Sequence, residues 1–144
     1  MSSWLKIGST INGEDNYDQL GYSIDLSSDG NVLAVGVHGD DENGSAAGQV
    51  RIYEYNNDEW NQVGLNINGE AAGDKSGSSI SVSDDGKTIA IGAYGNAGNG
   101  TNAGHTRIFK YISNAWTQLG SDIDGDAQII SGTSVSLSGD GTRV

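Results

Sequence analysis

The sequence predicts an all-β chain built from repeats of 56 residues, and three observations lead to this prediction. The tryptophans Trp4, Trp60 and Trp116 are spaced 56 residues apart. An ungapped comparison of residues 4–59 with residues 60–115 gives about 23 identical positions among 56, where chance gives only a few. Polar and apolar residues alternate with a period of two in several short stretches, and no stretch shows the periodicity or the caps of a helix. The chain is therefore expected to be a repeat protein made of short strands.

The clearest element of the unit is a predicted β-hairpin that begins at Leu20. Ile24 and Leu26 alternate with polar residues, as in a strand with one buried face. The turn at residues 28–31 contains Asp-Gly, which tolerates the positive φ angles of tight turns. The nearly continuous apolar run at residues 32–37 indicates a strand covered on both faces. The same hairpin recurs at residues 76–92 and begins a third time at residues 131–144.

Two further strands are expected to complete the unit. Residues 4–11 are predicted to form a short strand that starts with Trp4, followed by a polar connection at residues 14–20. The segment at residues 38–48 is too rich in glycine and charge for regular structure and is predicted to be a loop. Residues 49–55 alternate again as a strand, and residues 105–111 are their counterpart in the second repeat.

Four antiparallel strands repeated with a period between about 40 and 60 residues are the sequence signature of β-propeller blades. We expect a single domain over residues 1–144, a partial propeller in which repeat 1 covers residues 4–59, repeat 2 covers residues 60–115 and a partial repeat 3 covers residues 116–144. This amounts to about two and a half blades, whereas closed propellers need at least about four. The chain is therefore expected to be a fragment of a longer array or to self-associate, and two copies would leave a gap of about half a repeat in a ring.

Each blade packs against its neighbours, so a recurring set of apolar residues is expected to fill the space between blades. The evenly spaced tryptophans could instead stack on sugars, but an identical packing position in every repeat is the favoured interpretation of their spacing. The nine residues expected at inter-blade positions are Trp4, Trp60, Trp116, Ile24, Leu26, Ile80, Val82, Tyr53 and Phe109.

The composition argues against several classes of function. The net charge of −12 would repel phosphate backbones and anionic lipids, so we expect neither nucleic-acid binding nor attachment to a membrane surface. The sequence has no cysteine, which excludes disulfides and thiolate metal sites. No apolar run approaches the roughly 18 residues of a membrane span, and the first residues do not resemble a signal peptide.

Two acidic segments are candidates for a Ca²⁺ site, because carboxylate oxygens are the ligands that this ion prefers. One contains Asp40, Asp41 and Glu42, but its counterpart at residues 96–99 has no carboxylate. Solvated acidic loops are the favoured interpretation, and no cofactor is expected. The other segment, with the better candidates, contains Asp122, Asp124 and Asp126.

The sequence offers no combination of residues typical of an enzyme. His38 and His105 fall at different places in their repeats, so both are expected to be surface residues or local hydrogen-bond partners. Arg51 and Arg107 do recur, and each is expected to pair with a carboxylate on a neighbouring blade. Serines recur on the inner strand without a matching histidine, which argues against a Ser–His nucleophile and favours channel lining or hydrogen bonds between blades. These serines are Ser23, Ser27, Ser79, Ser83, Ser134 and Ser138.

The stretch LGYSIDLSSDGNVLAVG, followed by GQVRIYEYN, resembles the FG-GAP repeat of integrin α-type propellers. In that pattern Phe-Gly opens the inner strand, Gly-Ala-Pro closes the second strand, and Gly-x-Val-x-(Val/Ile)-Tyr follows. Leu20-Gly21, Gly36-Val37 and residues 48–53 occupy these places here. The calcium loop that such repeats often carry is not matched, because SSDGN, SDDGK and SGDGT offer too few oxygen ligands. WD40 repeats are the rival relatives, but their usual period is shorter than 56 residues, and their Gly-His and Trp-Asp signatures are missing.

The resemblance implies a non-enzymatic module for adhesion or for binding a protein or glycan, at a cell surface or outside the cell. The loops at residues 38–48 and 94–104 would then form the recognition surface. The alternative is a purely structural scaffold whose repeats serve self-assembly and bind no ligand.

Overall fold

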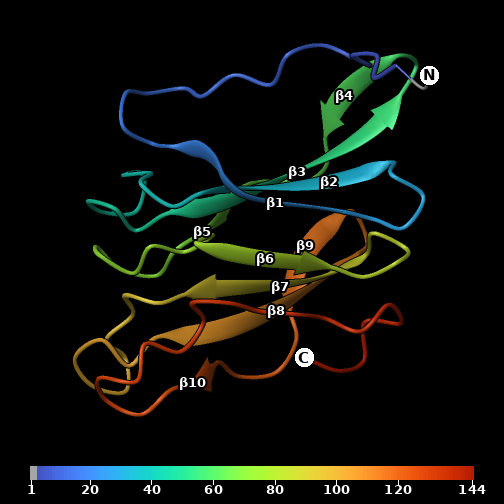
Figure 1. The fold of residues 1–144 in the computed structure, drawn as a ribbon. Coiled ribbons are helices and arrows are strands. Elements are labelled where there is room, and N and C mark those ends of the chain that lie inside the picture. Colours follow the sequence, from blue (N-terminus) through green and yellow to red (C-terminus); the bar gives the residue numbers. More distant parts are fainter. Residues whose placement is uncertain (1–2) are drawn as a thin grey trace.

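The computed structural model describes residues 3–144, and none of these residues is helical. Their strands form two antiparallel sheets that stack face to face (Figure 1). The fold is therefore all-β, with two sheets arranged like the blades of a propeller, as the repeat pattern predicts. No helix among the described residues is long and apolar enough to cross a membrane.

The first blade contains five strands that fill four positions. Its inner strands are β1 (Leu20–Leu26) and β2 (Val32–Val37), which are followed by β3 (Gln49–Asn56). The outer position is divided between β4 (Glu59–Gln62) and β5 (Ile67–Asn68), both of which pair with β3. The outer strand is thus interrupted at residues 63–66, where it bends.

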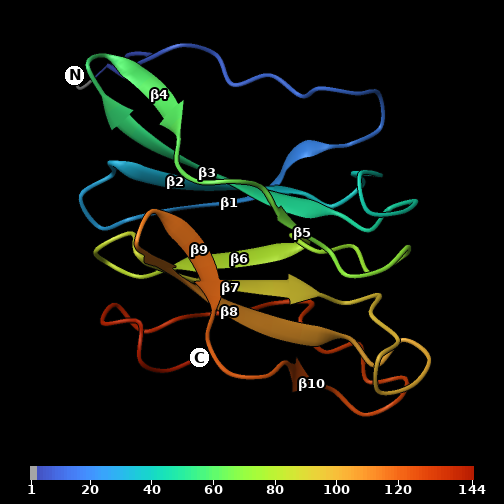
Figure 2. The ribbon, with the colours of Figure 1, turned by 180° about the vertical axis from the view of Figure 1, so that it is seen from behind.

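The second blade repeats this arrangement. Its strands are β6 (Ser79–Val82), β7 (Thr88–Ala93), β8 (His105–Ile112), β9 (Ala115–Gln118) and β10 (Ile123–Asp124). The order is β6-β7-β8, with β9 and β10 both paired with β8. Both blades are visible edge-on in Figure 1 and from behind in Figure 2.

The hydrophobic core lies between the two blades, because each blade contributes one apolar face to it. The first blade supplies residues of β2, β3 and β5, and the second blade supplies residues of β6, β7 and β8. Val32, Val63 and Trp116 pack against this cluster and are partly exposed. The buried members are Ala34, Val50, Ile52, Ile67, Ile80, Val82, Ile89, Ile91 and Phe109.

Inner-strand serines connect successive repeats through hydrogen bonds. The Ser23 hydroxyl donates to the carbonyl oxygen of Gly77 at 2.8 Å. The Ser79 hydroxyl donates to the carbonyl oxygen of Gly132, also at 2.8 Å. The expectation that such serines bond between blades is therefore correct for Ser23, whereas the Ser79 bond reaches a third repeat that forms no sheet among residues 3–144.

Three residues expected between blades are instead exposed. The exposed fraction is 64% for Ile24, 48% for Leu26 and 101% for Trp4. Ile24 and Leu26 occupy the positions of Ile80 and Val82, which face the preceding blade and are buried. Among residues 3–144, no third sheet covers this face of the first blade, so the same pattern leaves these side chains in water.

Tyr53 and Trp60 also lie on this side of the first blade. Tyr53 corresponds to Phe109 and is buried, but it is not part of the cluster between the blades. Trp60 is half-buried, and its ring lies close to Gly8, where an added Cβ would be 2.8 Å from the ring. The N-terminal segment that contains Gly8 runs along the first blade as an irregular chain (Figure 1).

Two predicted strand segments are not formed. Residues 4–11 contain no strand, although their equivalents β4 and β5 pair with β3. Among residues 3–144, no strand pairs with residues 4–11 as β3 pairs with β4 and β5. Residues 132–144 also form no strand, although the turn closes through the bond from Ser138 N to Arg143 O at 2.8 Å.

Candidate functional site

The loops at residues 38–48 and 94–104 lie at the same end of the two blades (Figure 1). Each loop joins the second strand of a blade to the third, so the antiparallel topology places it at this end. The connections at residues 69–78 and 125–131, which lead into the following repeat, lie beside them. The four segments together are called the loop layer below.

Repeated hydrogen bonds hold the loop layer together. The Asn43 side-chain amide donates to the carbonyl oxygen of Gly69 at 2.7 Å, and Asn99 donates to that of Gly125 at 2.9 Å. Backbone bonds also join the neighbouring segments, such as Lys75 N to Ala46 O at 3.1 Å. The same scaffold therefore presents two loops of different sequence.

An acidic cavity of about 450 Å³ opens at this end of the first blade. Asp40 and Asp41, both candidate calcium ligands, line it together with Glu42, but two of these carboxylates already serve the loop. Asp40 Oδ1 accepts the Glu42 N–H at 2.9 Å, and Asp41 Oδ1 accepts the Ala46 N–H at 2.6 Å. Asp40 and Asp41 therefore have a structural role in the loop that needs no bound ion.

Asp40 also belongs to a buried network around Arg51. The Gln49 side-chain amide donates to Asp40, and Arg51 Nη2 lies 3.9 Å from Asp40 Oδ2. Arg51 Nη2 also lies 3.0 Å from Glu14 Oε2, at the end of the chain segment that enters the first blade. The buried guanidinium is thus balanced by two carboxylates.

Arg107 occupies the equivalent place in the second blade. Its Nη1 lies 3.6 Å from Glu70 Oε1, and its Nη2 donates to the carbonyl oxygen of Asn68 at 2.7 Å. Both partners belong to the outer edge of the first blade or follow it. The predicted pairing of Arg107 with a carboxylate of the neighbouring blade is therefore confirmed.

The second acidic segment is divided by the fold. Only Asp122 joins a cluster with other potential metal ligands, namely Glu70 and His105. Asp124 lies in β10 and is exposed, as is Asp126. Within residues 3–144, this is the only group of three such side chains whose ligand atoms all lie within 4.8 Å of one another.

Both histidines are buried, so the expectation of surface positions is wrong. His38 stacks on Tyr22 with ring centroids 3.7 Å apart, and burial lowers the pKa of its imidazole, with a smaller contribution from nearby Lys75. His105 begins β8 beneath the connection between the blades. The alternation of polar and apolar residues indicates burial at neither position, because His38 follows the last residue of β2 and His105 is the first residue of β8.

The aspartates of the hairpin turns accept hydrogen bonds from residues of the same turn. Hydrogen bonds from the Ser27 hydroxyl and from the backbone N–H of Asn31 lower the pKa of Asp29. Asp85 and Asp140 have lowered pKa values for the same reason, since each accepts bonds from the serine two residues before it and from the backbone that follows. These carboxylates stabilise the turns, in keeping with the poor match to a calcium loop.

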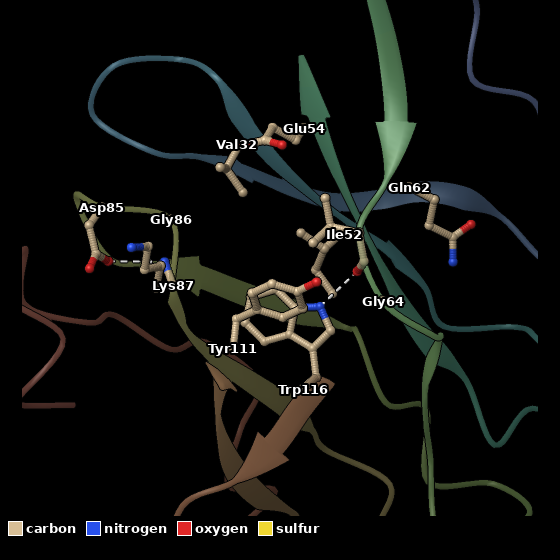
Figure 3. A pocket seen from close by; sticks show the side chains of 11 residues that line it. Val32, Ile52, Glu54, Gln62, Gly64, Asp85, Gly86, Lys87, Tyr111 and Trp116 are labelled. Carbon is tan, nitrogen blue, oxygen red and sulfur yellow. Dashed lines mark hydrogen bonds between the residues drawn. The ribbon is translucent and has the colours of Figure 1, made fainter. Parts of the chain in front are cut away.

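A second cavity, of about 320 Å³, lies between the blades at the end opposite the loop layer (Figure 3). Trp116 and Tyr111 form one wall, with ring centroids 5.1 Å apart. The Trp116 indole N–H donates to the carbonyl oxygen of Val63 at 2.9 Å, so the polar edge of the ring is already bonded. Glu54 and Lys87 also line the cavity, whose volume is at the lower end of the range for small-molecule sites.

Comparisons with known proteins add one finding. Residues 61–109 match the family model of the FG-GAP repeat. This segment runs from the outer strand of the first blade through the third strand of the second blade. A search of curated proteins found no match.

Proposed function

Since residues 61–109 are an FG-GAP repeat of propeller type, we propose that the chain is a non-enzymatic module that binds a protein or a glycan through its loop layer. The main support for this proposal is that equivalent hydrogen bonds hold two loops of different sequence in the two repeats. The bonds of Asn43 and Asn99 recur with the repeat, whereas the acidic run at residues 40–42 is replaced by uncharged residues at 96–98. Loops that vary on a fixed framework are the usual place for recognition.

The shape of the loop layer supports the same proposal. Both loops are tied to the adjacent connections, so binding would require little ordering of the chain, and less of the interaction energy would be lost as entropy. The acidic cavity at one end of the layer would favour ligands with cationic or hydroxyl groups over phosphorylated ones.

The proposal is tested by screening the chain on a glycan array and by pull-down of proteins, followed by charge reversal at matched positions. Glu42→Lys changes an exposed side chain of the loop layer, and Glu59→Lys makes the same change in β4 at the opposite end. We expect a captured ligand to lose affinity with Glu42→Lys and to keep it with Glu59→Lys. Failure to retain any ligand, or the reverse pattern, would contradict the proposal.

A second candidate is a structural role in which copies of the chain associate through the open face of the first blade. Its support is the contrast between exposed Ile24 and Leu26 and their buried equivalents Ile80 and Val82. The face that the second blade uses to contact its neighbour is thus present, uncovered, on the first blade. A second copy with the same apolar face buried against it would remove these side chains from water.

Light scattering at micromolar concentration tests this second candidate. We expect oligomers of the unmodified chain, and a shift towards monomer when Ile24 and Leu26 are both changed to serine. Ile112→Ser is the matched control, since this side chain is also exposed but lies at the end of β8. A compact monomer of the unmodified chain, or equal effects of both sets of changes, would overturn the role in assembly.

A further inference from the structure

Three potential metal ligands converge where the connection between the blades crosses the start of β8. Glu70 follows β5, His105 is the first residue of β8, and Asp122 directly precedes β10. His105 Nδ1 lies 3.5 Å from Asp122 Oδ2 and 4.0 Å from Glu70 Oε2. Asp122 is held near the start of β8 because β10, which it precedes, pairs with Thr106 and His105.

The environment of His105 points to a ligand. Its side chain is only 1% exposed, and neither ring nitrogen has a hydrogen-bond partner among residues 3–144. The separations from the two carboxylates exceed the usual 2.7–3.2 Å of an N–H···O bond. Ligand atoms about 2.0–2.1 Å from a tetrahedral ion lie roughly 3.3 Å from one another, which is close to the observed spacing of Nδ1 and Oδ2.

Neighbouring side chains orient both carboxylates towards His105. The Gln118 amide donates to Asp122 Oδ1 at 2.6 Å, which leaves Oδ2 facing the imidazole. Arg107 lies 3.6 Å from Glu70 Oε1 and leaves Oε2 facing it. Such outer partners are typical of metal sites, where they fix the direction of the ligands.

The first blade shows that this combination is not a general requirement of the repeat. Gln49 stands in place of His105, and Asn66 stands in place of Asp122. The orienting bond is retained, since the Gln62 amide donates to Asn66 Oδ1 at 2.7 Å. The fold therefore accepts two amides at these positions, and the second blade replaces both with groups that bind metal ions well.

We propose that Glu70, His105 and Asp122 form a site for a divalent transition-metal ion, with a fourth position open to water or an exogenous ligand. One imidazole nitrogen and two carboxylate oxygens suit an ion of the zinc class, whereas Ca²⁺ prefers oxygen ligands alone. With the guanidinium of Arg107 counted, the two carboxylates leave one net negative charge to offset the ion. Glu70 belongs to the loop layer, but the metal site is argued from its own contacts and does not depend on the proposed recognition of a protein or glycan.

The proposal is tested by titrating the metal-free chain with Zn²⁺ in isothermal titration calorimetry. We expect one ion per chain and a higher melting temperature when Zn²⁺ is bound, since an ion that binds only the folded state stabilises it. The spectrum of the Co²⁺-loaded chain should show the intense visible bands of a tetrahedral site. An absence of saturable binding at micromolar Zn²⁺ would overturn the proposal.

The first blade supplies the matched variants. His105→Gln and Asp122→Asn each introduce the amide found at the equivalent position, so we expect the fold to be kept and Zn²⁺ affinity to fall on the order of 100-fold. Gln118→Ala leaves the ligands in place and should weaken binding roughly 10-fold, as loss of an orienting partner does. His38→Gln removes the other buried histidine and should leave binding unchanged; zinc binding that survived His105→Gln, or was lost with His38→Gln, would refute the assignment.

Discussion

Replacement of Gly64 by alanine tests whether the tryptophan of each repeat packs against the blade that precedes it. Gly64 has a φ of +76°, and a Cβ at this position would lie 2.8 Å from Trp116 Cδ1 and 3.2 Å from Nε1. The ring cannot move freely, because its N–H is bonded to Val63 O and it packs against the core. The substitution should therefore displace Trp116 from the interface between the blades.

The expected cost follows from two terms. A non-glycine residue in the left-handed region costs about 1–2 kcal/mol, and forcing extra volume against a packed ring costs about 1–3 kcal/mol. Gly120 is the equivalent residue of the next repeat, with a φ of +71° and nothing within 4 Å of an added Cβ. Gly120→Ala should show the backbone term alone, so the two variants should differ by about 1–3 kcal/mol.

Urea denaturation of both variants, monitored by circular dichroism, measures this difference. The indole N–H signal of Trp116 in an NMR spectrum reports whether the bond to Val63 is lost. We expect this signal to shift in Gly64→Ala and to stay in place in Gly120→Ala. Equal destabilisation of the two variants, with an unchanged Trp116 signal, would refute the packing argument.

Three further predictions concern single side chains. Ser79→Ala should lower the free energy of unfolding by about 0.5–1.5 kcal/mol, because it removes a neutral hydrogen bond between repeats; urea midpoints that coincide with those of the parent would contradict this. The pKa of Asp85 is lowered first by its bond from Ser83, so its contribution to stability is present above the ordinary aspartate pKa and is lost as pH falls through the lowered value. Asp85→Asn should accordingly lose less stability than the parent between neutral and strongly acidic pH, and parallel acid-unfolding curves would argue against it. The NMR titration of His38 should have its midpoint below 6.5, because burial lowers its pKa, and a midpoint above this value would show that the ring is solvated.

The sequence predicted the elements that depend on local chemistry. The Asp-Gly turns at residues 29–30 and 85–86 lie in hairpins as expected, because a turn of this kind is specified by the residues within it. The 56-residue period likewise predicts that successive blades are equivalent, since the equal spacing of Trp4, Trp60 and Trp116 follows from equal strand and loop lengths.

The prediction was wrong where structure depends on neighbours rather than on local sequence. Ile24 and Ile80 have the same pattern around them, yet only Ile80 has a blade to contact, and the sequence of one strand does not report this. The metal-ligand candidates show the same limit. Asp122 was recognised by its acidic neighbours, but Glu70 and His105 are distant in sequence and meet it only through the packing of one blade on the next. A comparison of the repeats could have indicated the cluster, because the amides Gln49 and Asn66 are replaced by the metal-binding side chains of His105 and Asp122.

The hydroxyl groups of Ser23 and Ser79 both bond to carbonyl oxygens of the main chain. A main-chain carbonyl is offered by every amino acid, so the hydrogen bond itself needs no particular side chain. The two acceptors, Gly77 and Gly132, are nevertheless glycines with φ angles of +81° and +78°, where an added Cβ would lie 2.5 Å and 2.2 Å from a main-chain oxygen. Duplication of a unit would reproduce both halves of the link at once, without a compensating mutation elsewhere. Duplication of the coding segment can therefore lengthen the array, while the surface residues of each new unit remain free to change.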